Sequence, residues 1–219
     1  MIFVLASASP ARLLTLRRAG IEPVVIVSDV DEDAVLAEAH DQSPARQVTL
    51  LAEAKARDVA QRLRSGTVAA PVGSTDGVVI LGCDSMLELD GQIMGKPGDA
   101  ATARSRWKQM RGRRGILHTG HWLLASHGGP AAREAHGASA TVVHFADITD
   151  AEIDAYVATG EPLRVAGGFT IDGLGGPFIT GLEGDHHGVV GVSLPLLRTL
   201  LAAVGVGITD LWAPPPHPA

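Results

Sequence analysis

The chain has 219 residues, of which 46% are hydrophobic and 19% are charged, and its formal net charge at pH 7 is −6. This composition excludes wholesale disorder, and the negative charge argues against nonspecific binding to nucleic acid. A single cysteine excludes an intrachain disulfide framework and a cysteine-rich zinc site, so we expect a reducing compartment, the cytoplasm.

Two apolar stretches resemble a signal peptide or a membrane span at first sight. Residues 2–6 are too short for the apolar part of a signal peptide, and no basic residue precedes them. Residues 188–208 are divided by Ser193 and Pro195 into shorter elements. We therefore expect no membrane partner, and we expect a single domain over residues 1–213 with a disordered tail at 214–219.

Residues 3–5 predict a first strand, after which Ser9 and Pro10 provide the N-cap and first position of a helix. Such a turn directs backbone N–H groups and the hydroxyls of Ser7 and Ser9 outward at the positive end of a helix, which suits a phosphate. Arg12 lies in the first turn, where its charge opposes the helix dipole. Its position favours an anionic partner, although an ordinary helix cap is the alternative.

Residues 24–27 predict a second strand, and an acidic cluster follows it: Asp29, Asp31, Glu32 and Asp33. A strand followed by D-x-D is typical of haloacid-dehalogenase phosphatases, but Asp33 stands where that motif has Thr or Val. One or two of these carboxylates suit a magnesium ion. The alternative is a solvated loop.

Ser43 and Pro44 open the longest predicted helix, which runs to about Leu63. Its apolar stripe consists of Val48, Leu51, Ala52, Ala56, Val59 and Leu63. Lys55 falls on the same stripe. An inward lysine either extends its ammonium to the edge of the protein, the commoner outcome, or meets a buried anion.

The centre of the chain predicts a buried strand from residue 78 that ends at Asp84. A hairpin with the type I′ turn Asp90-Gly91 follows, and its return strand leads to Lys96. An acid and a lysine are thus presented from neighbouring segments, a pairing that metal-assisted chemistry on a phosphate uses. The alternative is that both side chains are simply solvated.

The second half of the chain predicts four further features: a helix from Asp99 to Gly112, an antiparallel pair of strands at 116–125 and 139–145, a helix opened by the capping box of Thr149 and Glu152, and a last helix at 193–204. Between the last two helices, residues 163–191 are dense in glycine, which indicates tight turns. We interpret His186-His187 as the tip of a hairpin rather than as metal ligands.

Several ordered motifs together resemble the Maf family, the septum-formation-associated nucleoside triphosphate pyrophosphatases. The signature S-x-S-P-R-R is matched by residues 7–12, with Ala11 in place of the first arginine. The others are Val30-Asp31-Glu32, Lys55-Ala56, Gly82-Cys83-Asp84-Ser85, residues 90–97 with D-G-x-x-x-G-K-P in full, and late stretches at 160–163, 166–175 and 189–196. The resemblance covers residues 5–201, and a series of motifs in order is far more specific than any one of them.

The resemblance implies hydrolysis of a nucleoside triphosphate between its α and β phosphates with a divalent metal, Mg²⁺ or Mn²⁺. It implies that Asp84 is the general base and that Glu32 and Asp84 hold the metal. The residues that it assigns to the triphosphate are Ser7, Ser9, Arg12, Lys55 and Lys96. The implied fold is α/β, with an elongated mixed sheet flanked by helices and two lobes around a central cleft, as in inosine triphosphate pyrophosphatases.

The base preference does not follow from the resemblance. Members that prefer dTTP and UTP have Arg, Thr and Gln at the positions of Ala11, Ser85 and Asp172, whereas members that prefer methylated guanosine triphosphate have Trp, Gln and Glu. This chain fits neither set. We hypothesise that Asp172, as an acceptor, favours a base that presents N–H donors, and that the small side chain of Ala11 loosens selection for the base.

A nucleotide-binding regulator of cell division with little turnover is the alternative function, suggested by the family's name. The joint presence of Asp84, Glu32, Lys55 and Lys96 counts against it, because a binding module does not need the base. A homodimer is the oligomer that the family suggests, and we expect no nucleic-acid partner.

Overall fold

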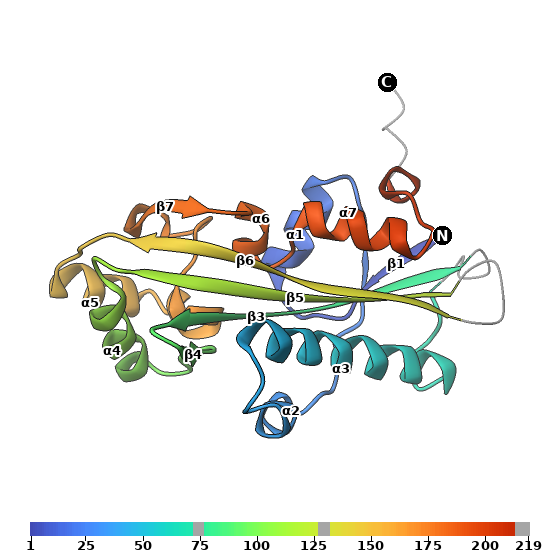
Figure 1. Ribbon diagram of the computed structural model, residues 1–219, viewed down its shortest axis with the longest axis horizontal. Helices are drawn as coiled ribbons and strands as arrows, with labels where there is room; N and C mark the ends of the chain where they lie inside the picture. The colour runs from blue at the N-terminus through green and yellow to red at the C-terminus, as the bar shows by residue number, and fades with distance from the viewer. Residues whose placement is uncertain (72–76, 127–131, 213–219) are drawn as a thin grey trace.

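The computed structural model describes residues 1–71, 77–126 and 132–212. These residues form one seven-stranded mixed sheet in the order β2-β1-β3-β5-β6-β7, with β4 also paired to β3. Three long strands, β3 (Val78–Leu89), β5 (Arg114–Ser126) and β6 (Arg133–Phe145), run through an elongated molecule (Figure 1). The predicted α/β fold with an elongated mixed sheet flanked by helices is confirmed, whereas the tail at 214–219 lies outside the described residues.

Four short strands complete the sheet. Strand β1 (Ile2–Leu5) pairs in parallel with β2 (Val24–Val25) and with the start of β3, as far as Leu81. Strand β4 (Gln92–Met94) pairs antiparallel with β3 from Leu87 onward. On the other side of the sheet β7 (Ile179–Glu183) pairs antiparallel with β6.

The prediction that a strand ends at Asp84 is wrong. Strand β3 continues to Leu89 because β5 pairs with it residue by residue, with Asp84 opposite Gly120. On the other edge of β3, the pairing with β1 stops at Leu81 and the pairing with β4 begins at Leu87. Within the described chain, residues 82–86 therefore have a strand partner on one side only. We call this segment the open edge of β3.

Helix α3 (Pro44–Arg64) lies directly against one face of the sheet (Figure 1). Two glycines allow this close approach. A Cβ atom on Gly82 would lie 2.0 Å from the carbonyl oxygen of Ala52, and one on Gly120 would lie 2.2 Å from that of Val48. Backbone therefore meets backbone, and α3 brings Lys55 close to the middle of β3.

Hydrophobic clusters fill both ends of the elongated sheet. At one end, α1 (Pro10–Arg18) and α7 (Leu194–Ala203) cover the face opposite α3. At the other end, α4 (Ala100–Met110) and α5 (Asp150–Ala158) enclose Trp107, whose indole N–H donates to the carbonyl oxygen of Gly168 at 2.8 Å. The open edge of β3 lies between these two ends.

The long elements predicted from the sequence are present, and the short ones differ. Asp31 caps a helix, α2 (Glu32–Glu38), where a solvated loop was one expectation. His186-His187 begins helix α6 (His186–Val190) and is not a hairpin tip. The remaining short elements are the 3₁₀ helices η2 (Glu161–Arg164), η3 (Ala166–Gly168), η4 (Gly176–Phe178) and η5 (Ile208–Leu211).

Within the described residues, every helix is too short or too polar to cross a membrane.

Candidate active site

Three of the predicted site residues, two carboxylates and a lysine, meet at the open edge of β3. Asp84 lies in the middle of this edge, Lys55 comes from α3, and Glu32 is the first residue of α2. The ammonium Nζ of Lys55 is 2.5 Å from Oδ1 of Asp84 and 2.7 Å from Oε1 of Glu32. Lys55 is therefore a buried ion-pair partner, so of the two outcomes left open for it the structure shows contact with buried anionic groups.

The charges of two further cations, Lys96 and Arg12, also act on Glu32. Partial burial raises the pKa of Glu32. The charge of Lys55 and the hydrogen bond from its ammonium, together with weaker effects of Lys96 and Arg12, outweigh burial and hold this pKa below its ordinary value. Glu32 is therefore ionised at neutral pH. Three cations thus act on one carboxylate at the open edge.

Arg12 is buried and makes four hydrogen bonds from its side chain. Its Nε donates to the carbonyl oxygen of Gly191 at 3.0 Å, and Nη1 donates to Ser7 Oγ and to the carbonyl oxygen of Cys83, both at 2.9 Å. Its Nη2 donates to Ser85 Oγ at 3.1 Å. In the part of the chain that the structure describes, Arg12 forms no ion pair with a carboxylate, so its buried charge favours an added anion.

The two serines of the first turn have different roles. Ser7 is buried, and its Oγ accepts hydrogen bonds from Arg12 and from the N–H of Ser9, so the predicted outward orientation of its hydroxyl is wrong. Ser9 is only half-buried and caps α1, as its Oγ accepts from the backbone N–H of Arg12. Ala11 lies half-buried in the same turn.

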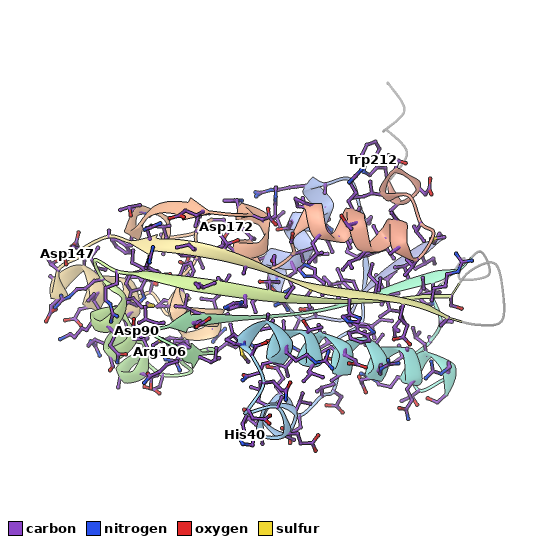
Figure 2. All side chains as sticks on the ribbon, in the orientation of Figure 1. His40, Asp90, Arg106, Asp147, Asp172 and Trp212 are labelled. Atoms are coloured by element: carbon purple, nitrogen blue, oxygen red, sulfur yellow. The ribbon has the colours of Figure 1, made fainter. Side chains whose placement is uncertain are left out.

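Lys96 and Asp172 are both exposed. Lys96 follows β4, and among the described residues it has neither a hydrogen bond nor an ion pair, although its charge acts on Glu32. Asp172 lies between η3 and η4, where Figure 2 labels it, and it has no hydrogen bond or ion pair to the described residues. Lys96 therefore lies near enough for its charge to act on Glu32, but neither Lys96 nor Asp172 has a hydrogen bond or ion pair to the cluster among the described residues.

Sequence reasoning missed two fully buried polar residues of β5. Thr119 Oγ1 donates to the carbonyl oxygen of Gly188 at 2.8 Å and lies 2.9 Å from Ser85 Oγ. His121 accepts at Nε2 from the N–H of Ser193, at 2.9 Å, and donates from Nδ1 to the carbonyl oxygen of Thr119. The signal was two polar residues at alternate positions, and so on one face, of a strand rich in apolar residues.

A divalent cation fits the donor set of this cluster. Glu32 and Asp84 place two carboxylates around one ammonium, and Mg²⁺ commonly binds one or two carboxylates together with water and phosphate oxygens. The described residues contain no group of three or more His, Cys, Asp or Glu side chains able to hold a metal. A metal here would therefore need oxygen atoms of the substrate or of water.

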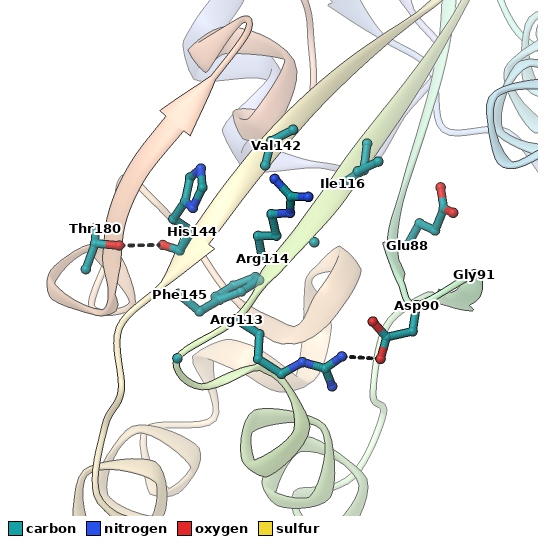
Figure 3. A pocket seen from close by; sticks show the side chains of 12 residues that line it. Glu88, Asp90, Gly91, Arg113, Arg114, Ile116, Val142, His144, Phe145 and Thr180 are labelled. Carbon is teal, nitrogen blue, oxygen red and sulfur yellow. Dashed lines mark hydrogen bonds and ion pairs between the residues drawn. The ribbon is translucent and has the colours of Figure 1, made fainter.

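A hollow of about 830 Å³ lies apart from this cluster, over the far ends of β3, β5 and β6 (Figure 3). Asp90, Arg113, Arg114 and His144 are among its lining residues, and Arg113 forms an ion pair with Asp90. None of the predicted site residues lines this hollow.

Comparison with known proteins gives a consistent result. A family model described as "Maf-like protein" matches residues 2–204. A protein of Rhodococcus opacus (strain B4) named nucleoside triphosphate pyrophosphatase is 55% identical over 215 residues, which cover 96% of each chain. Proteins with the same name from Streptomyces coelicolor and Nocardia farcinica are 54% and 55% identical, over 96% and 99% of this chain and 94% and 97% of their own.

Proposed function

Since the chain belongs to the Maf family, we propose that it is a nucleoside triphosphate pyrophosphatase, which hydrolyses the bond between the α and β phosphates and releases pyrophosphate. The relatives' shared name supports the enzyme class, and their full-length similarity covers both ends of the sheet. The cytoplasmic location and the homodimer stay predictions.

The observation that supports this proposal best is the buried contact between Lys55 and the two carboxylates. Asp84 is buried and paired with the ammonium of Lys55, and a carboxylate so placed is suited to accept a proton from an attacking water. Lys55 holds Asp84 at a fixed place and compensates its charge. Arg12 and Lys96 supply the positive charge that phosphoryl chemistry requires around the triphosphate and its leaving group.

A divalent cation bound by Glu32 and Asp84 would neutralise further negative charge on the triphosphate. Lys55 already contacts both carboxylates, so the same two side chains would hold the metal as well as the lysine. The contact with Lys55 would keep both carboxylates paired with a cation when no metal is bound.

The test is release of pyrophosphate from a panel of ordinary and modified nucleoside triphosphates, with Mg²⁺ or Mn²⁺, by the native chain and by Asp84→Asn. Removal of the base with its shape retained is expected to lower kcat by about 10²-fold or more. Asp90→Asn is the matched control, because Asp90 is an exposed turn residue whose ion-pair partner, Arg113, lies outside the cluster.

Equal activity of Asp84→Asn and the native chain would show that Asp84 is not the base. Tight binding of nucleotides without turnover of any of them would instead favour the regulator of cell division. Activity in Asp90→Asn is expected to match that of the native chain.

A further inference from the structure

A chain of hydrogen bonds runs from the backbone of α6 to the guanidinium of Arg12. The carbonyl oxygen of Gly188 is 2.8 Å from Thr119 Oγ1, which is 2.9 Å from Ser85 Oγ. Ser85 Oγ is in turn 3.1 Å from Nη2 of Arg12. These hydrogen bonds cross from β5 to β3, because Thr119 and Ser85 are register partners.

Only one placement of the two hydroxyl hydrogens satisfies all three contacts. A carbonyl oxygen only accepts, so the single hydrogen of Thr119 points to Gly188. The contact between the hydroxyls then uses the hydrogen of Ser85, with Thr119 as acceptor. Arg12 donates to Ser85, which consequently has no hydrogen left for any other group.

We propose that Thr119 is a positioning residue: it holds the hydroxyl of Ser85 as a pure acceptor, and through that acceptor it orients the guanidinium of Arg12 for an anionic ligand. Without Thr119, Ser85 regains a free hydrogen, and its oxygen no longer faces Arg12 in one fixed orientation. The inference rests on the proposed function in so far as the anion is taken to be the substrate's triphosphate.

The position of Thr119 agrees with this role. It is fully buried and, among the described residues, has no hydrogen bond to Lys55, Glu32 or Asp84, and its own carbonyl oxygen accepts from Nδ1 of His121. Ser85 by contrast is only half-buried. Its position therefore lies between the buried Thr119 and the surface from which a ligand would approach. Thr119 therefore acts on a ligand only through Ser85 and Arg12.

The experiment compares Thr119→Val, which keeps the shape but removes the hydroxyl, with Thr119→Ser, which keeps the hydroxyl. Thr119→Val is expected to raise KM for the nucleoside triphosphate roughly tenfold, the upper range for one lost hydrogen bond between neutral groups, and to change kcat much less. Thr119→Ser is expected to stay within about twofold of the native KM, since both hydrogen bonds are retained.

Ser139→Ala is the matched control. Ser139 is the register partner of Thr119 on β6, and its buried hydroxyl has no hydrogen-bond partner in the described chain. It is expected to leave KM unchanged. If Thr119→Val does not fold, Ser85→Ala interrupts the same chain at a half-buried position and takes its place in every comparison.

A double-mutant cycle with Arg12→Lys tests whether Thr119 acts through the guanidinium. In the Arg12→Lys background, Thr119→Val is expected to change KM by less than about twofold. A second full loss of about tenfold would overturn the proposal, as would an equal rise of KM in Ser139→Ala.

Calorimetric binding of inorganic pyrophosphate separates this inference from the proposed function. Weaker binding in Thr119→Val than in Thr119→Ser supports the positioning role, even if the native chain hydrolyses no nucleotide in the panel. Turnover by the native chain with equal pyrophosphate binding in both variants would overturn the positioning role and leave the enzyme assignment intact.

Discussion

Two buried side chains near the open edge, Cys83 and His121, have pKa values that their surroundings explain. The ammonium of Lys55 contacts two carboxylates. Burial raises the pKa of the Cys83 thiol to about 12, more than the charges of Arg12 and Lys55 lower it, so this neighbour of Asp84 is no nucleophile at neutral pH. His121 is neutral, because burial, and then the charge of Arg12, lower its pKa to about 4.

His121 makes the stability of the protein depend on pH. Its pKa falls from an ordinary 6.5 to about 4 on folding, so between these values the unfolded chain binds a proton that the folded chain does not. The free energy of unfolding therefore decreases as pH falls through this window. The full loss is roughly 3 kcal/mol, and denaturant unfolding at about pH 7.5 and about pH 5 measures most of it.

His121→Gln is the control for this pH dependence. Its amide retains a donor for the carbonyl of Thr119 and an acceptor for the N–H of Ser193, but it does not titrate. An identical loss of stability at low pH in this variant would assign the effect to other groups.

Most residues of the site were predictable from the sequence, but their contacts were not. The resemblance assigned Asp84, Glu32 and Lys55 to one site, and they do meet. The hydrogen-bond partners of Arg12 could not be predicted from the sequence, because Cys83 and Gly191 lie 71 and 179 residues away along the chain. No local pattern encodes such distant contacts.

Among the elements, α3 has the greatest influence on the site. Its backbone touches the sheet at two glycines, and the lysine that it carries can reach Asp84 only from this short distance. The glycines of β3 and β5 therefore determine the depth at which Lys55 lies.

Gly82→Ala is expected to displace α3. The added methyl group would lie 2.0 Å from the carbonyl oxygen of Ala52, and backbone cannot rotate away as a side chain can. We expect a loss of roughly 1–3 kcal/mol or more in the free energy of unfolding, typical of an overpacked core, together with lower activity in whatever fraction folds. Denaturant unfolding and pyrophosphate release measure the two effects.

Gly181→Ala on β7 is the matched control. A Cβ atom there would meet only a carbon of His144 at 3.8 Å, an ordinary contact. Equal stability of Gly82→Ala and Gly181→Ala would mean that α3 does not depend on backbone contact with β3.

The elements that sequence patterns predicted correctly are those with many buried residues. Helix α3 has a long apolar stripe and was recognised with nearly its true bounds. Helix α2 has no buried residue, so an amphipathic pattern could not reveal it. The full length of β3 was missed because Gly82, Asp84 and Ser85 interrupt its apolar run, and its continuity comes from pairing with β5.

For the molecule as a whole, the three long strands connect the hydrophobic clusters at both ends. Leu87 on β3 belongs to the cluster around Trp107, whereas Leu81 on the same strand packs near α7. Because one strand serves both clusters, we expect the two ends to unfold together.

Two core variants test this cooperativity. Met110→Ala in one cluster and Leu201→Ala in the other remove fully buried side chains, so each is expected to lower the free energy of unfolding by about 2–5 kcal/mol. Both should give one transition, at the same denaturant concentration by circular dichroism and by tryptophan fluorescence. Two separate transitions in either variant would show that the ends are independent folding units.

The open edge of β3 also has a consequence for how copies of this protein behave in a crowded solution. A strand with unsatisfied backbone groups is a template onto which a strand of another chain can add, and such addition leads to aggregation. Here Nη1 of Arg12 occupies the carbonyl of Cys83 with a side chain instead of a strand. Arg12 thus leaves one carbonyl fewer on this edge for a strand of another chain, and the same side chain is the one that we propose to bind the anion.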